Sequence, residues 1–207
     1  MPDSAPKDVD SSEDESDWKL DDRLAENEAT SNFDGKDDKF WPQLVLDELI
    51  TKDSVLREFE WKADSMEPED ERLIDFIVGR AKKLTALTVH VDFGEKLLDA
   101  MKFYMSNGID DKRLGEDADL GPKLRELNKG LWRPAKVRKF RENRPKVLVP
   151  IITTSETNHR FERGTILPFT LQMINPEVKA RSGAFSYVQK VTIHDGHFED
   201  PACPVCH

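Results

Sequence analysis

Apolar side chains recur at helical spacing through the first two thirds of the chain. The longest such run lies in "MEPEDERLIDFIVGRAKKLTALTVHV", where Pro68 and three acidic residues stand where a helix start favours them. Its inner face would carry Leu73, Ile74, Ile77, Ala81, Leu84 and Leu87. This spacing predicts one continuous helix at the centre of a helical domain.

Shorter helices are predicted on both sides of that run. Leu44, Val45, Leu49 and Ile50 suit one helix, and Thr51 or Asp53 would cap a second that carries Val55, Leu56 and Phe59. The stretch "DFGEKLLDAMKFYMSNGIDD" predicts another, with Asp92 as its cap, an aromatic and Met stripe facing the core, and a stop at Gly108.

After Pro145 the pattern changes from helical to β. "KVLVPII" and "GTILPFTLQMI" are β-branched and apolar, and "AFSYVQKVTIH" alternates with period two. Helices early and strands late predict an α+β fold. We expect a helical domain of about four to five helices over 40–146, then a few β-strands over 147–198 and a flexible tail over 199–207.

The negative charge is concentrated at the N-terminus. Residues 1–39 hold fourteen Asp or Glu against five Lys or Arg, whereas the formal charge of the whole chain is −10. This stretch has few apolar residues to bury, and chain entropy opposes ordering it. We therefore predict a disordered acidic tail over residues 1–39.

A basic segment lies between the helical and β patterns. Residues 121–146 carry ten Lys or Arg against Glu126 and Glu142, with Trp132 and Phe140 interleaved. Such a cluster can track a phosphate backbone, dock the acidic tail of the same chain, or form a solvated helix face. Because the chain is acidic overall and carries no nucleic-acid motif, we expect protein partners and not nucleic acid.

The sequence lacks targeting signals and has few cysteines, and both features predict a protein inside the cell. The sequence has no run of about eighteen apolar residues, and its N-terminus lacks the pattern of a secretory or transit peptide. Only two cysteines occur, Cys203 and Cys206, so a disulfide framework is not expected. These features predict a cytoplasmic or nuclear protein without a membrane span.

The stretch "RSGAFSYV" has the spacing of a degenerate phosphate-binding loop. If Val188 is placed at the final valine of G-x-G-x-x-G-x-V, then Arg181, Gly183 and Ser186 fall at the three glycine positions. Nucleotide contacts would then come from Gly183, Ala184, Phe185, Ser186 and Val188. The spacing fits an ordinary hairpin turn equally well.

Several short motifs in order resemble a group of filamentous-fungal protein-kinase-domain proteins. They are "GIDDKRL", "LWRPAKVRKFRENRPKVLVPI", "HRFERGTILPF" and "RSGAFSYVQKVTIHDGHF". The likeness as a whole covers about residues 40–200. The resemblance implies that residues 40–165 form a pre-kinase region. It also implies that residues 166–198 are the opening strands of a kinase N-lobe.

The same resemblance implies that this chain stops before the catalytic residues. No Lys follows Lys190, "HRF" at 159–161 is not H-R-D, and Asp92-Phe93-Gly94 precedes the loop by some ninety residues. We expect a regulatory or interaction fragment without catalysis and without a cofactor, whose partners are other proteins or the rest of a kinase domain. The alternative is the N-terminal part of an active Ser/Thr-type kinase, which would use ATP and Mg²⁺ only with a complete kinase domain.

A metal site at the C-terminus is a further alternative. His194, His197, Cys203 and Cys206 offer two nitrogens and two thiolates, a set that zinc accepts. Five residues separate the two pairs, which is shorter than usual finger spacing, and Cys206 lies beside the chain end. Free thiols are the simpler expectation, and haem attachment at "CPVCH" is not expected without export.

Overall fold

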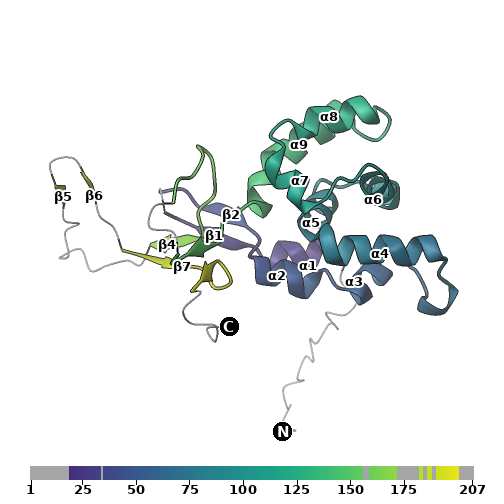
Figure 1. Cartoon of the computed structure of the whole chain (residues 1–207), viewed down its shortest axis with the longest axis horizontal. Helices are drawn as coiled ribbons and strands as arrows, with labels where there is room; N and C mark the ends of the chain where they lie inside the picture. Colours follow the sequence, from purple (N-terminus) through teal and green to yellow (C-terminus); the bar gives the residue numbers. More distant parts are fainter. Residues whose placement is uncertain are drawn as a thin grey trace, which may run out of the picture.

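Helices form one body of the molecule and short strands extend from one side of it (Figure 1). The computed structural model describes residues 19–33, 35–155, 159–171, 182–183, 186–187 and 190–200. The predicted α+β class is confirmed, although the described residues contain nine short α-helices instead of four to five. Among these residues every helix is too short or too polar to reach from one side of a bilayer to the other.

The α-helices are α1 (Leu20–Glu26), α2 (Gln43–Leu49), α3 (Lys52–Glu58), α4 (Pro68–Arg80), α5 (Lys82–His90), α6 (Leu97–Ser106), α7 (Asp111–Glu116), α8 (Leu120–Leu127) and α9 (Pro134–Asn143). The 3₁₀ turns are η2 (Ala63–Ser65), η3 (Gly94–Lys96) and η4 (Arg144–Val147). The strands are β1 (Ala29–Ser31), β2 (Asp38–Phe40), β3 (Ile152–Thr153), β4 (Phe169–Leu171), β5 (Ser182–Gly183), β6 (Ser186–Tyr187), β7 (Val191–Ile193) and β8 (Phe198–Glu199).

Helix α5 lies at the centre of the helical body. It contacts α1, α2, α4, α6, α7 and α9, and six consecutive residues from Leu84 to Val89 are buried. Two of these six are threonines, whose hydroxyls donate back to helix carbonyls: Thr85 to Ala81 and Thr88 to Leu84, both at 2.6 Å. A helix surrounded by protein can carry such polar groups only when they find partners inside.

The predicted central helix is broken in two at Ala81. That residue has φ −137° and ψ 28°, which ends α4 and starts α5 in a new direction. The break leaves the first N–H groups of α5 without intrahelical partners. The Asp111 carboxylate is the partner of two of these groups. It accepts hydrogen bonds from the backbone N–H of Lys83 at 3.0 Å and from that of Leu84 at 2.8 Å. Within the "GIDDKRL" motif, Asp111 therefore has a structural role as the cap of the central helix.

Several predicted helix ends are present in the structure. Thr51 and Ser54 form a reciprocal capping box at the start of α3, and Pro68 is the first residue of α4. Gly108, at φ +60°, follows the end of α6. The prediction for Asp92 is wrong: the turn after it is the 3₁₀ helix η3, whose N-cap is Phe93, and no side chain caps it.

Order begins before residue 40, so the predicted disordered tail is wrong for its second part. Leu20 and Leu24 of α1 are buried in the core, and the Trp41 indole N–H donates to the Leu24 carbonyl at 2.9 Å. Glu28 pairs with Lys146 at 2.7 Å. The few apolar residues of this stretch are enough because the rest of the domain supplies their packing surface. Residues 1–18 lie outside the described part of the chain.

The strands form separate two-stranded pairs. β1 pairs with β2, β4 with β7 and β5 with β6, all antiparallel, while β3 and β8 are parallel. The predicted strand "KVLVPII" is wrong for its first part: residues 144–147 form η4, and Val147 is buried in the helical core. The N–H of Asn32 donates to the Phe169 carbonyl at 3.3 Å, which links the β1–β2 hairpin to β4.

Replacing Asp111 with alanine removes the cap of the central helix. We expect the free energy of unfolding to fall by about 1–2 kcal/mol, as for other lost caps. Urea denaturation of the purified chain measures this change. Asp75→Ala, at an exposed position of α4, is the matched control and should change stability by less than about 0.5 kcal/mol. Equal stability of the two variants would contradict the capping role.

Gly196 tests the contact between the β segments and α2. It has φ +77°, and a Cβ there would lie 2.6 Å from Leu44 Cγ. We expect Gly196→Ala to lower stability by about 1–3 kcal/mol through backbone strain and the clash. Gly79→Ala, in α4 with nothing within 4 Å of the added Cβ, should instead leave stability unchanged or raise it. Thermal unfolding of both variants measures the difference.

Candidate functional site

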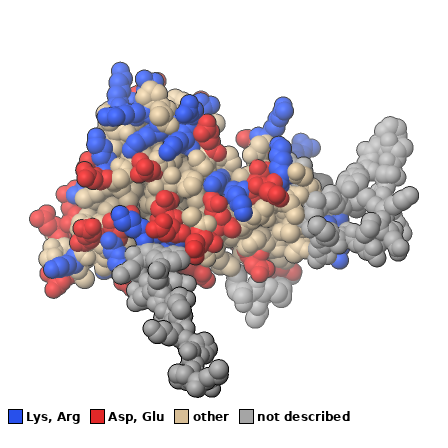
Figure 2. Space-filling view, turned by 180° about the vertical axis from the view of Figure 1, so that it is seen from behind, with Lys and Arg blue, Asp and Glu red and all other residues tan. Residues whose placement is uncertain are grey.

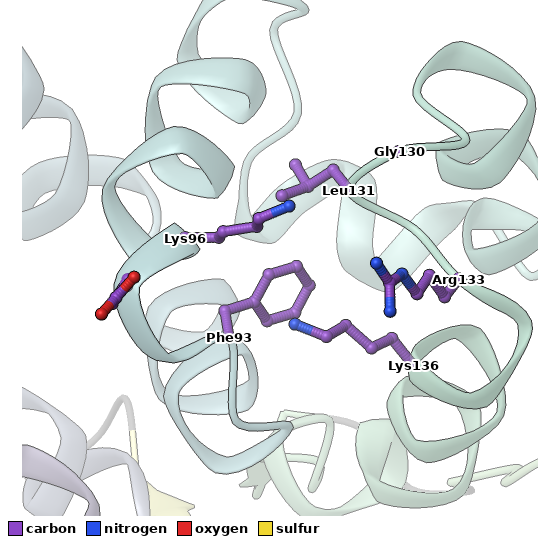
Figure 3. Close-up of a pocket in the computed structure, with 7 residues that line it drawn as sticks. Phe93, Lys96, Gly130, Leu131, Arg133 and Lys136 are labelled. Atoms are coloured by element: carbon purple, nitrogen blue, oxygen red, sulfur yellow. The ribbon is translucent and has the colours of Figure 1, made fainter.

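A cationic pocket opens between the turn after α5 and the start of α9 (Figure 3). Its cavity of about 360 Å³ is within the usual range for ligand pockets. The residues that line it are Phe93, Glu95, Lys96, Gly130, Leu131, Arg133 and Lys136. Three of these are cations, one is an acid, and Phe93 and Leu131 provide an apolar wall.

The three cations come from two distant parts of the sequence. Lys96 ends η3, Arg133 is the N-cap of α9, and Lys136 lies in the first turn of that helix. In Figure 3 the side chains of Lys96, Arg133 and Lys136 extend toward the space around the Phe93 ring. The Lys136 ammonium lies 3.9 Å from the centre of that ring, a cation–π contact.

The buried aromatic cluster beneath the pocket holds it in place. The Phe93 ring lies 5.0 Å from that of Trp132, which also packs edge-on against Phe140 at 5.2 Å. Trp132 and Phe140 are fully buried. Since Phe93 precedes η3 and Trp132 precedes α9, packing of these rings fixes the two segments that carry the cations.

Charge in the pocket is unbalanced in favour of the cations. Burial lowers the pKa of Lys136, and the neighbouring positive charges of Lys96 and Arg133 lower it further, while Asp92 opposes them. Within the described residues neither Lys96 nor Arg133 has an ion-pair partner. An anion in this pocket would relieve that repulsion.

The pocket belongs to a wider basic surface on α8 and α9. Figure 2 shows Lys and Arg side chains crowding one end of the molecule, whereas Asp and Glu are more frequent below. Several cations of the segment have anionic partners: Lys123 pairs with Asp117, Arg138 with Glu142 and Lys146 with Glu28. A second hollow, of about 450 Å³, lies along α9 and is lined by Pro134, Val137, Arg138, Arg141 and Glu142.

The Asp92-Phe93-Gly94 tripeptide is part of this structural turn. Asp92 has φ +64° and Gly94 φ +51°, which reverses the chain between α5 and α6. Phe93 is only 4% exposed, because its ring packs against Trp132 and the Lys136 ammonium lies over it. The tripeptide therefore has a packing role in the turn between α5 and α6.

The predicted nucleotide-loop residues lie only partly in the described chain. Gly183 in β5 and Ser186 in β6 are paired residues of an antiparallel hairpin, while Ala184, Phe185 and Val188 lie outside the described residues. The β4–β7 and β5–β6 pairs are separate two-stranded sheets. The loop is separate from the cationic pocket, which is built by other elements.

The predicted zinc ligands are also divided. His197 is buried, and both of its ring nitrogens have backbone partners: Nδ1 donates to the Pro150 carbonyl at 3.0 Å, and Nε2 accepts from the Gln43 N–H at 3.3 Å. His194 and His197 both pack edge-on against Phe40, each at 5.5 Å. Cys203 and Cys206 lie outside the described residues. Zinc binding by His197 would require breaking one of its two hydrogen bonds.

Sequence reasoning found only part of the pocket. Arg133 and Lys136 belong to the basic segment that composition singles out, but Lys96 lies outside it on an unremarkable helix start. No local pattern brings Lys96 to α9, since the contact depends on the packing of Phe93 against Trp132. Comparisons with protein-family models, with curated proteins and with solved structures find no match to this chain.

The environment of His197 predicts a pH-dependent stability. Burial lowers its pKa below the ordinary value of 6.5 in the folded protein, and nearby His194 and Lys83 add to the shift. The unfolded chain therefore binds more protons than the folded chain below about pH 7, and stability falls as the pH decreases. We expect a loss of about 1 kcal/mol per pH unit at most between pH 6.5 and 5.

Denaturation at pH 7.5, 6.5 and 5.5 measures this effect. His197→Gln should be less stable at pH 7.5, because the packing and the paired hydrogen bonds are lost, and should have a smaller pH dependence. His159→Gln is the control and should keep the slope of the parent chain. An unchanged slope in His197→Gln would assign the pH dependence to another group.

Proposed function

We propose that this chain is a non-catalytic interaction module that binds an acidic segment of a protein partner in the cationic pocket. The observation that carries the proposal is the meeting of Lys96, Arg133 and Lys136 around the Phe93 ring. Ammonium and guanidinium groups bind carboxylates, and the wall of Phe93 and Leu131 receives the apolar stems or rings of a peptide. Glu95, on the same lining, disfavours ligands that place an anion at that point.

The proposal extends the resemblance to kinase-domain proteins. A helical region that precedes a kinase domain is a suitable position for a regulatory binding module. On this proposal the degenerate loop at 183–188 takes no part in phosphate transfer in this chain. The module works in the cytoplasm or nucleus. The proposal of a non-catalytic chain rests on the degenerate loop, in which only Gly183 of the three glycine positions is a glycine.

An active kinase whose later part follows this chain is the second candidate. It is favoured by the antiparallel β5–β6 hairpin at the position of the glycine loop. In that protein the loop would cover the phosphates of ATP, and Mg²⁺ and the catalytic residues would come from the later part. The binding role of the helical body would remain the same.

An acidic peptide tests the proposed function. The probe is a fluorescein-labelled ten-residue peptide of alternating Asp and Glu with one Phe, measured by anisotropy at 50 mM salt. We expect micromolar binding that weakens as salt is added, because exposed charges are screened. Arg133→Gln/Lys136→Gln should weaken binding about tenfold or more, since two charge-assisted hydrogen bonds are lost.

Lys52→Gln/Lys62→Gln is the matched control. It removes the same charge from exposed positions at and beyond α3, and it should bind the peptide as the parent chain does. Equal losses in both double variants would show that only net charge matters and would overturn the pocket. Tighter binding of a single-stranded oligonucleotide with the same dependence on Arg133 and Lys136 would replace the protein partner with nucleic acid.

A further inference from the structure

The nearest source of acidic peptide for the cationic pocket is in this chain. Residues 8–17, "DVDSSEDESD", hold six carboxylates and no basic residue. They directly precede α1, the first described helix. A segment of this composition has the charge opposite to that of Lys96 and Arg133, neither of which has an ion-pair partner within the described residues.

The described part of the acidic stretch lies against the basic segment at one point. Glu28 pairs with Lys146 at 2.7 Å, and the Lys146 ammonium also lies 5.2 Å from the Trp41 ring. Asp21, in the first turn of α1, lies 3.7 Å from Nδ1 of His90 at the end of α5. The Glu28–Lys146 pair therefore joins the acidic stretch to the basic segment, and the Asp21–His90 contact places the start of α1 beside the end of α5.

The pocket is within reach of the residues before α1. Phe93 follows His90 by three residues, which corresponds to at most about 11 Å along the chain. With the Asp21–His90 contact and the side chains included, Lys19 and Phe93 are no more than about 30 Å apart. Asp8 precedes Lys19 by eleven residues, which span about 36 Å when extended, so even at that distance the N-terminal carboxylates of residues 8–17 can reach the pocket while α1 stays in place.

We propose that residues 8–17 occupy the cationic pocket of their own chain and thereby compete with a protein partner. This inference rests on the proposed function, because it takes the same pocket as the binding site. A tethered segment has an effective concentration in the millimolar range, so even a weak contact in cis holds back a partner that binds in trans. The acidic segment is then a built-in regulator of the module.

Neutralising the segment in the full-length chain tests the regulator. The variant Asp8→Asn/Asp10→Asn/Glu13→Gln/Asp14→Asn/Glu15→Gln/Asp17→Asn keeps its length and removes its charge. We expect this variant to bind the labelled acidic peptide about ten to one hundred times more tightly than the parent chain at 50 mM salt. The difference should shrink at 500 mM salt. Adding Arg133→Gln/Lys136→Gln to the variant should abolish the gain.

A carbodiimide, which joins carboxylates to nearby amines, gives a second readout. In the monomeric parent chain we expect cross-links from residues 8–17 to Lys96 or Lys136, found by mass spectrometry at a yield independent of protein concentration. A yield that rises with concentration would assign the segment to a second copy and overturn the contact in cis.

The outcomes separate this inference from the proposed function. If parent and neutralised chains bind the peptide equally and the cross-links to Lys96 and Lys136 are missing, the regulator is overturned while the binding module stands. If adding Arg133→Gln/Lys136→Gln to the neutralised variant does not weaken its binding of the peptide, the proposed function is wrong. The proposed regulation by residues 8–17 is then wrong as well.

Discussion

The burial of α5 on every side is the constraint on which the rest of the structure depends. A helix in that position has no water for its polar groups, so each one needs a partner in the protein. Asp111 accepts from its first N–H groups, the hydroxyls of Thr85 and Thr88 return to helix carbonyls, and Tyr104 shares a hydrogen bond with Thr88 at 3.2 Å. Burial of the Tyr104 phenol raises its pKa far above the ordinary value, so the hydroxyl stays neutral. The break at Ala81 is what allows Asp111 to reach the helix start.

The exit of the chain from α5 creates the pocket. After His90 the backbone turns through two residues with positive φ, Asp92 and Gly94, and this turn inserts Phe93 beside Trp132. Lys96 and the start of α9 are brought together as a consequence. The Trp132 indole N–H is a buried donor without a hydrogen-bond partner among the described residues, which indicates that aromatic packing and not hydrogen bonding fixes this ring. The aromatic cluster thus fixes the two segments that form the pocket, and the three cations on these segments line it.

The β segments are attached to the helical body by a small number of specific contacts. His197 joins Pro150 to Gln43, the start of α2, and Gly196 approaches Leu44 so closely that a side chain would collide. Because neutral imidazole is needed for both hydrogen bonds, attachment weakens when this histidine is protonated. The histidine that looks like a metal ligand in the sequence is thus a structural link between two parts of the fold.

The sequence by itself determined the α+β order of the chain and the features that depend on neighbouring residues. The capping box at Thr51, Pro68 at the start of α4 and the stop at Gly108 follow from local preferences, and the α+β class follows from the change of period after Pro145. Only the tertiary structure decided the break at Ala81, the folding of residues 20–26 into helix α1, and the hydrogen bond between His197 and Gln43. The meeting of Lys96 with Arg133 and Lys136 belongs to the same group. Each of these joins residues distant in the chain, and side-chain spacing carries no information about which distant surfaces will pack together.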